Sequence, residues 1–120
     1  MPLAGQRQRD ELRNMSIFDE RKKGRDAQYA HDQEMEFKAQ ARRNKLLGLW
    51  AAKLMGKSEA EAEAYAKEVI VSDFEEAGDH DVFRKIRRDF DAANVEQSDH
   101  QIERKMEELL AEARAQVAAS

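Results

Sequence analysis

The sequence contains no cysteine, only one proline and five glycines among its 120 residues, and 7% of its residues are aromatic. The absence of cysteine excludes disulfide frameworks, thiolate nucleophiles and cysteine-ligated zinc sites. The scarcity of proline and glycine argues against a fold of strands and tight turns, because alanine and long, unbranched helix-forming residues predominate instead. The composition therefore predicts an all-α protein.

Long apolar segments are also missing. The longest apolar run, 46–52, includes a glycine and is far shorter than the roughly 20 residues that span a bilayer. The arginine-bearing start of the chain is not followed by the apolar stretch of a secretory signal. A chain of this length suits one hydrophobic core. We therefore expect a single-domain, soluble cytoplasmic protein that does not insert directly into a membrane.

The charge of the chain is unevenly distributed. Charged residues make up 38% of the sequence, and the formal net charge is −4. Residues 1–45 hold 11 Lys and Arg against 8 Asp and Glu, a net charge of +3, which leaves −7 for the remainder. This asymmetry indicates that the two parts of the chain face different surroundings.

The order of helix-forming segments and helix-breaking signals predicts four helices. A long helix over 19–55 is uninterrupted by proline, and later helices are expected to end near residues 77, 93 and 117. Glycine or asparagine ends a helix, whereas Ser-x-x-Glu/Gln and Asp begin one. These signals are Gly56, the capping box at 58–61, Gly78, Asp79, Asn94 and the capping box at 98–101.

Apolar residues at spacings of three and four mark the inner face of each helix. Because the connections between the helices are short, we expect successive helices to pack as antiparallel neighbours in a bundle over 46–118. The predicted core residues are Met35, Ala39, Leu46, Leu47, Trp50, Ala51, Leu54, Tyr65, Val69, Ile70, Phe74, Val82, Phe83, Ile86, Phe90, Ala93, Ile102, Met106, Leu109, Leu110, Ala113 and Val117.

The first helix is too long for this bundle. Its 37 predicted residues would extend about 55 Å, whereas helices of 15–20 residues extend only about 22–30 Å. Residues 19–32 are almost entirely polar, so they have no apolar face to bury. We expect this front part to overhang the bundle and to be partly disordered in the free protein, because a lone polar helix is marginal in water. Residues 1–15 are expected to be a disordered tail or to precede an alternative start.

Two aromatic residues lie in this otherwise polar stretch. Phe18 and Tyr29 have no core of their own to enter, and buried aromatic side chains often anchor protein interfaces. The simpler alternative is incidental exposure to solvent. We interpret both residues as candidate contacts with a partner protein.

No catalytic, metal-binding or cofactor-binding motif is apparent. His31, His80 and His100 lie far apart in the sequence and form none of the close pairs that bind zinc or a di-iron centre. Residues 56–58, Gly-Lys-Ser, resemble the end of a phosphate-binding loop, but the motif's earlier glycine is replaced by Ala51. We therefore expect a protein that is not an enzyme and needs no metal or cofactor.

The sharpest basic cluster, 42–45 (Arg-Arg-Asn-Lys), leaves three interpretations open. It could be a solvated or internally paired face, it could contact an acidic protein, or it could bind the phosphates of a nucleic acid. The neighbouring glutamates and the acidic total disfavour nucleic acid as a partner. A helical nucleic-acid-binding or regulatory adaptor is nevertheless the alternative function.

Three motifs of the first half of the chain are distinctive: Ser-Ile-Phe-Asp-Glu-Arg (16–21), Tyr-Ala-His-Asp-Gln-Glu-Met-Glu-Phe-Lys (29–38) and Ala-Arg-Arg-Asn-Lys-Leu-Leu-Gly-Leu-Trp-Ala-Ala (41–52). With them the sequence strongly resembles the zeta subunit of alphaproteobacterial F-type ATP synthases, and the resemblance covers essentially residues 15–120. Later motifs are also similar, including Ser-Asp-Phe-Glu-Glu-Ala-Gly-Asp (72–79) and Arg-Lys-Met-Glu-Glu-Leu-Leu (104–110).

This resemblance implies an inhibitor of ATP hydrolysis with a four-helix fold. Its N-terminal helix region, 16–45, would enter an α/β catalytic interface of the ATP synthase soluble head and block rotation. The implied partners are the α and β subunits, with γ as a further candidate, at the cytoplasmic face of the inner membrane. The inhibitory segment would be 16–31, and its candidate contact residues are Phe18, Asp19, Arg21, Arg25, Tyr29 and His31.

The sequence departs from the family pattern in two places. Gly24 stands where relatives usually have better helix formers, which costs roughly 1 kcal/mol of helix propensity. Residues 1–14 precede the usual start of the family. Either departure would be expected to weaken inhibition.

Overall fold

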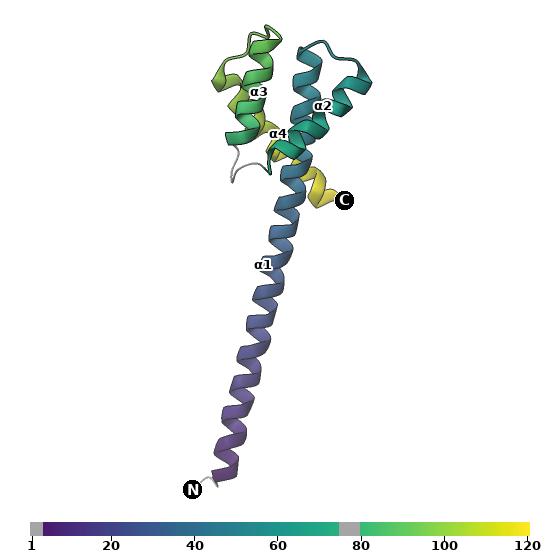
Figure 1. Ribbon diagram of the computed structural model, residues 1–120. Coiled ribbons are helices and arrows are strands. Elements are labelled where there is room, and N and C mark those ends of the chain that lie inside the picture. The colour runs from purple at the N-terminus through teal and green to yellow at the C-terminus, as the bar shows by residue number, and fades with distance from the viewer. Residues whose placement is uncertain (1–3, 75–79) are drawn as a thin grey trace. The chain divides into compact units, whose positions relative to one another are not determined.

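The computed structural model describes the backbone of residues 4–74 and 80–120, and the side chains of 27–74 and 80–120. These residues form four α-helices and no strand: α1 (Ala4–Leu54), α2 (Glu59–Ser72), α3 (His80–Ala92) and α4 (Asp99–Ala119) (Figure 1). The predicted all-α, four-helix class is confirmed. The chain divides into two units, Met1–Glu34 and Met35–Ser120, and each is considered by itself.

The predicted capping boxes are confirmed at the starts of α2 and α4. Ser58 Oγ accepts a hydrogen bond from the Glu61 backbone N–H, and the Ser58 N–H donates to the Glu61 carboxylate. Ser98 and Gln101 make the same two bonds. Each box satisfies two backbone N–H groups that have no partner within the helix.

Left-handed residues follow α1 and α3 as the sequence predicted. Gly56 has a φ of 75°, and Asn94 has a φ of 57°. Glycine adopts this conformation without a Cβ penalty, and asparagine tolerates it better than most residues. These two residues turn the chain sharply enough for short connections to join the helices.

The second helix is shorter than predicted. It ends at Ser72 rather than near residue 77, and the Ser72 hydroxyl donates a 2.7 Å hydrogen bond back to the Val69 carbonyl. Serine side chains that bond to the backbone in this way compete with continued helix. Phe74 therefore lies outside α2 and is 70% exposed, so its prediction as a core residue is wrong. Gly78 and Asp79 lie outside the described residues.

The first helix begins earlier than predicted. Its backbone is helical from Ala4 rather than from residue 19. The only proline of the chain is Pro2, and the residues that follow include the helix formers Gln, Arg, Glu and Leu. The side chains of 4–26 lie outside the described residues. The expected disorder of 1–15 in the free protein stays a prediction.

The main hydrophobic core of the unit Met35–Ser120 receives side chains from all four helices. Most of the predicted inner faces are confirmed, and two further alanines, Ala52 and Ala66, are buried with them. Two predicted core residues, Leu54 and Ala93, are instead exposed, because they lie at or beyond helix ends where no neighbouring helix covers them. The buried core residues are Leu47, Ala51, Ala52, Tyr65, Val69, Val82, Ile86, Phe90, Ile102, Met106 and Leu109.

Gly48 permits close packing of α1 against α2. A Cβ atom at this position would lie 2.6 Å from Ala66 Cα and 3.2 Å from Ala66 Cβ. Because the nearer atom belongs to the backbone, a side chain at residue 48 would force the two helices apart. Glycine at 48 and alanine at 66 thus set the helix separation together.

Polar groups and aromatic rings connect the helices around this core. The Tyr65 hydroxyl donates a 2.7 Å hydrogen bond to the Asp89 carboxylate, which also pairs with Lys85 Nζ at 3.1 Å. The ring of Trp50 packs edge-on against Phe90, with 5.5 Å between centroids. Burial, together with the bond to Asp89, raises the pKa of the Tyr65 hydroxyl far above its usual value of 10.0.

Substitution of Gly48 by alanine should destabilise the fold by about 1–3 kcal/mol, because overpacking a close helix contact displaces backbone. Denaturant unfolding measures the change. Lys53→Ala, on an exposed position of the same helix, should stay within about 0.5 kcal/mol of the parent protein. Equal stability of Gly48→Ala and the parent would contradict the proposed close approach.

Tyr65 should make the protein sensitive to alkali. Since the folded state raises the pKa of this hydroxyl, stability is full below the ordinary pKa of 10.0 and falls as the pH rises above it. Tyr65→Phe should lose about 0.5–1.5 kcal/mol at neutral pH, together with its hydrogen bond, and should show a weaker loss of stability above pH 10. Thermal unfolding at a series of pH values tests both effects. Equal stability at neutral pH would exclude the first effect, and parallel pH curves above pH 10 would exclude the second.

Candidate functional site

The described side chains of α1 change from exposed to partly buried at residue 35. Every residue from 27 to 34 is exposed, whereas Met35 and Glu36 are half-buried and Ala39 is buried. Within 27–34 the hydrogen bonds found between side chains link residues one helical turn apart, such as Gln28 to Asp32. This stretch therefore presents its side chains to solvent.

Two of the six predicted contact residues have described side chains, and both are exposed. Tyr29 is 66% exposed, and its hydroxyl accepts a 2.9 Å hydrogen bond from Gln33 Nε2. His31 lies two residues further along the same helix. The backbones of the other four residues belong to α1, but their side chains lie outside the described residues: Phe18, Asp19, Arg21 and Arg25.

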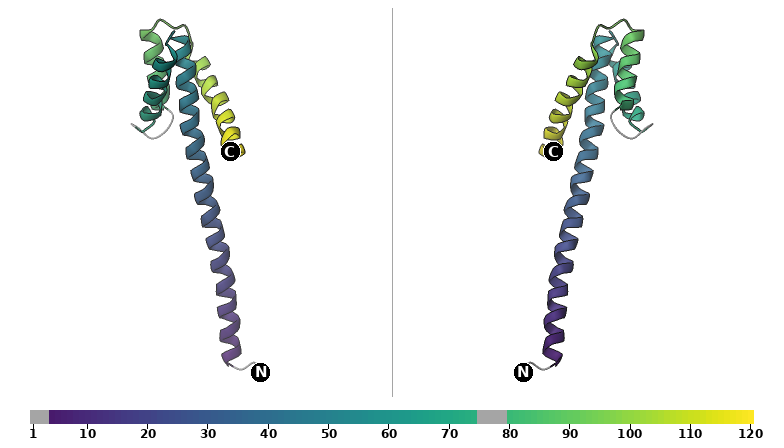
Figure 2. Two further views of the ribbon diagram at one scale, coloured as in Figure 1. Left: turned by 90° about the vertical axis from the view of Figure 1, so that its right-hand side faces the viewer. Right: turned by 90° about the vertical axis from the view of Figure 1, so that its left-hand side faces the viewer.

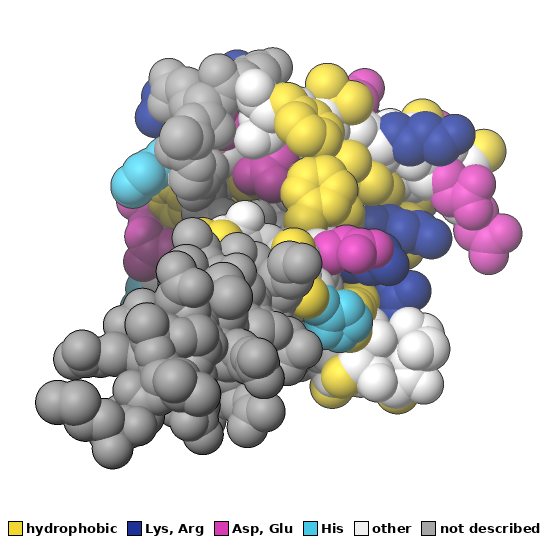
Figure 3. Space-filling model, turned by 90° about the horizontal axis from the view of Figure 1, so that it is seen from below, with side chains coloured by type: hydrophobic (Ala, Val, Ile, Leu, Met, Phe, Trp, Pro, Cys, Tyr) yellow, Lys and Arg dark blue, Asp and Glu magenta, His cyan; other side chains and the backbone are white. Residues whose placement is uncertain are grey.

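One exposed aromatic residue was missed by sequence reasoning. Phe37 is 61% exposed on α1, and it lies between the half-buried Glu36 and the exposed Lys38. The available signal was its register, because Phe37 is out of phase with the apolar stripe that includes Met35 and Ala39. Viewed from below, hydrophobic side chains of the protein reach the surface among side chains of both charge signs (Figure 3).

A small second core joins α1 to the end of α4. Ala39 packs with Ala113 and Val117, and Met35 is partly buried against them. The two helices run side by side here (Figure 2). Since three of these four side chains are small, the hydrophobic contribution of this cluster is modest.

An ion pair reinforces this second core. Arg114 Nε and Nη2 donate to the two carboxylate oxygens of Glu36 at 3.1 and 2.6 Å. This bidentate geometry is the favourable one for arginine and a carboxylate. The hydrogen bonds from Arg114 hold the pKa of Glu36 below its usual 4.5 and raise the pKa of Arg114.

The basic cluster 42–45 does not form one exposed surface. Arg43 and Asn44 are each only 1% exposed, and Arg43 Nε donates a 2.9 Å hydrogen bond to Asn44 Oδ1. Arg42 and Lys45 are exposed, with Arg42 Nη1 lying 3.5 Å from Gln116 Oε1. Half of the cluster is therefore internal, which weakens the interpretation of 42–45 as a nucleic-acid contact.

The described residues contain neither a candidate metal site nor a candidate membrane-spanning helix. No group of three or more His, Asp or Glu side chains there could hold a metal ion. In that same part of the chain, none of the helices combines the length and apolar character required to cross a membrane.

Comparison with known families decides the family of the chain. The family model described as "ATPase inhibitor subunit zeta" matches residues 15–116. The chain belongs to this zeta-subunit family. The predicted inhibitory segment, 16–31, lies entirely within the zeta match, whereas residues 1–14 precede it. Membership of a family of inhibitor subunits agrees with the expectation that this zeta-family chain is not an enzyme.

The zeta-family chain is also similar to a solved structure. A protein whose structure was determined by solution NMR is 50% identical to the zeta-family chain in sequence. The match covers 71% of the zeta-family chain and 96% of the chain in that structure, with a TM-score of 0.64. A search among curated protein sequences gives no match. The identity and the coverage show that the zeta-family chain shares its fold with that protein.

The contact between Glu36 and Arg114 predicts a small acid-sensitive contribution to stability. Because folding lowers the pKa of Glu36, the contribution is present above pH 4.5 and is lost as the pH falls through the lowered value. Arg114→Ala should lower Tm slightly at pH 7, and the difference from the parent should shrink as the pH falls below 4.5. Arg104→Ala, on an exposed face of the same helix, serves as the control. A pH-independent difference would exclude the ion pair as the cause.

Proposed function

We propose that this zeta-family protein inhibits ATP hydrolysis by an F-type ATP synthase through insertion of its N-terminal helix. The segment 16–31 would enter an α/β catalytic interface of the soluble head and prevent the movements that rotation requires. The observation that carries the proposal is the exposure of every described side chain of α1 before residue 35, in a chain whose family is one of ATPase inhibitor subunits.

The energetic reason is the lack of an apolar face on this segment. An isolated polar helix gains little stability in water, because nucleation is costly and no side chains are buried. A cleft in the partner can supply the missing burial and the hydrogen bonds to side chains. Binding and ordering of the segment would then occur together, at a cost in conformational entropy that the contacts must exceed.

Tyr29 is the best-described contact residue. Its large side chain is 66% exposed and makes only a local hydrogen bond to Gln33. Tyrosine is enriched among the residues that dominate binding energy, since it combines a large apolar ring with a polar hydroxyl. Phe18 would provide a second apolar contact, while Asp19, Arg21, Arg25 and His31 would provide polar and charged ones.

The helical bundle would serve as the anchor of the inhibitor. Residues 46–118 contain the main core, which is assembled from all four helices. Such a unit can remain folded while the N-terminal segment orders against the partner. The partners we propose are the α and β subunits, with γ as a further contact, at the cytoplasmic face of the inner membrane.

Deletion of residues 1–31 tests whether the N-terminal segment inhibits while the bundle folds without it. The truncated protein should keep the helical circular dichroism and cooperative unfolding of the bundle, because the described core lies entirely after residue 34. It should lose inhibition of purified ATP synthase head. Full inhibition by the truncated protein would exclude the N-terminal segment as the inhibitory element.

Tyr29→Ala should raise the concentration needed for half-maximal inhibition about tenfold or more, which corresponds to the loss of roughly 1.4 kcal/mol or more at an interface anchor. Phe18→Ala should act in the same direction. Phe37→Ala is the matched control, because it removes an aromatic ring of similar exposure from α1 outside 16–31. Unchanged potency of Tyr29→Ala, or an equal effect of Phe37→Ala, would contradict the assignment.

A further inference from the structure

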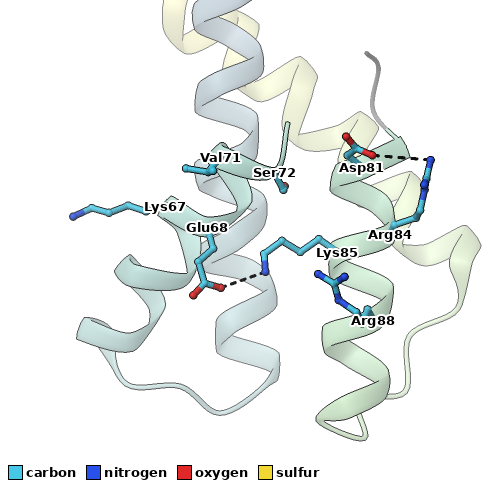
Figure 4. Close-up of a pocket in the computed structure, with 8 residues that line it drawn as sticks. All are labelled: Lys67, Glu68, Val71, Ser72, Asp81, Arg84, Lys85 and Arg88. Atoms are coloured by element: carbon cyan, nitrogen blue, oxygen red, sulfur yellow. Dashed lines mark hydrogen bonds and ion pairs between the residues drawn. The ribbon is translucent and has the colours of Figure 1, made fainter. Parts of the chain in front are cut away.

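The polar side chains of the protein differ in what they can still offer a partner. In a pocket of about 600 Å³ between α2 and α3, Lys85 Nζ lies 3.2 Å from the Glu68 carboxylate (Figure 4). The same ammonium group lies 3.1 Å from the Asp89 carboxylate, and its side chain is only 14% exposed. These charges are therefore used within the bundle. The hydroxyl of Tyr29, on the exposed part of α1, is used only in part.

Gln33 occupies one side of the Tyr29 hydroxyl. Its side-chain Nε2 donates a 2.9 Å hydrogen bond to the Tyr29 oxygen. The two residues lie one helical turn apart on α1, at the spacing that brings side chains together on a helix surface. An amide N–H can only donate, so this bond uses a lone pair of the hydroxyl and not its hydrogen. Among the described residues, no side chain accepts that hydrogen.

The direction of this bond determines which partner group suits Tyr29. A hydroxyl that accepts one hydrogen bond becomes a better donor, because linked hydrogen bonds polarise one another. Tyr29 is 66% exposed, so its O–H can be directed away from α1. The complementary group on a partner is therefore a hydrogen-bond acceptor, namely a carboxylate or carbonyl oxygen.

A similar bond in the neighbouring row of the helix has no such consequence. Gln28 Nε2 donates a 3.0 Å hydrogen bond to Asp32 Oδ1, also across one turn and also on the exposed surface. The ionised carboxylate that accepts this bond has no hydrogen to donate onward. The pair of Gln28 and Asp32 thus matches the pair of Gln33 and Tyr29 in spacing and exposure, and it provides a control.

From this geometry we propose that Gln33 is a positioning residue of the inhibitory contact, which directs the Tyr29 hydroxyl to donate to an acceptor oxygen of the ATP synthase head. The choice of partner rests on the proposed function. Gln33 lies two residues beyond the segment 16–31, so the contact surface would include the helical turn that follows this segment. A hydroxyl that is already oriented loses less conformational entropy on binding.

Replacement of the donor at residue 33 by an acceptor tests this role in the full-length protein. Gln33→Glu introduces a carboxylate that would accept the Tyr29 hydrogen itself. It should raise the concentration needed for half-maximal inhibition of purified head about three- to tenfold, as expected for the loss of one hydrogen bond. Tyr29→Phe should have a similar effect, because it removes the hydroxyl. Gln33→Lys keeps a donor and should stay within about twofold of the parent.

The same substitutions in a Tyr29→Phe background separate positioning from direct contact. Gln33→Glu should have no further effect there, whereas a direct contact between residue 33 and the head would persist without the hydroxyl. Gln28→Ala removes the control bond to Asp32. Its effect should be the same with and without Tyr29→Phe. All of these positions are exposed, so the substitutions should not disturb the core.

The outcomes separate this inference from the proposed function. Parental potency of Gln33→Glu, or an equal loss with and without the Tyr29 hydroxyl, would overturn the positioning role and leave inhibition by 16–31 intact. An equal loss for Gln33→Lys and Gln33→Glu would also overturn it. Parental potency of Tyr29→Phe would show that the hydroxyl makes no contact. If the full-length parent does not inhibit the head, the proposed function is wrong and this contact with it.

Discussion

The burial of α1 against the other helices is the interaction on which the structure depends. From Met35 onward this helix supplies Ala39, Leu47 and Ala51 to the two cores, and a helix in water is stabilised chiefly by burying such a face. Before residue 35 the described side chains are all exposed. The helix thus passes from a part whose side chains enter the two cores to a part whose described side chains are exposed. The proposed inhibitory function is a consequence of that difference.

The core that holds α1 is thin, so it relies on close approach and on polar connections. Gly48 lets α1 approach Ala66 of α2, and alanines occupy several buried positions where larger side chains would separate the helices. Arg87 of α3 bonds to Asp99 at the start of α4 and to the Gln97 carbonyl before it, and it also pairs with Asp91 within α3.

Local signals in the sequence predicted much of this fold. Both capping boxes, the left-handed Gly56 and Asn94, and the apolar stripes of α3 and α4 depend on residues a few positions apart, so they could be identified without tertiary information. The burial of Arg43 and Asn44 depends on which helix covers these positions, and no local pattern encodes that. The early end of α2, which leaves Phe74 exposed, goes with a local bond from Ser72 to the Val69 carbonyl that the sequence reading did not include. For the inhibitory segment, periodicity predicted a polar helix, whereas the family resemblance alone implied its partner.

In the proposed mechanism, the segment 16–31 orders against the ATP synthase head while the bundle stays as it is. Hydrogen exchange along the full-length chain, measured with and without purified head, tests it most directly. We predict rapid exchange of the amides of 16–31 in the free protein and strong protection in the inhibited complex, with much smaller changes in the core of 46–118. Inhibition of the head without any change in exchange over 16–31 would show that this segment does not order against the head.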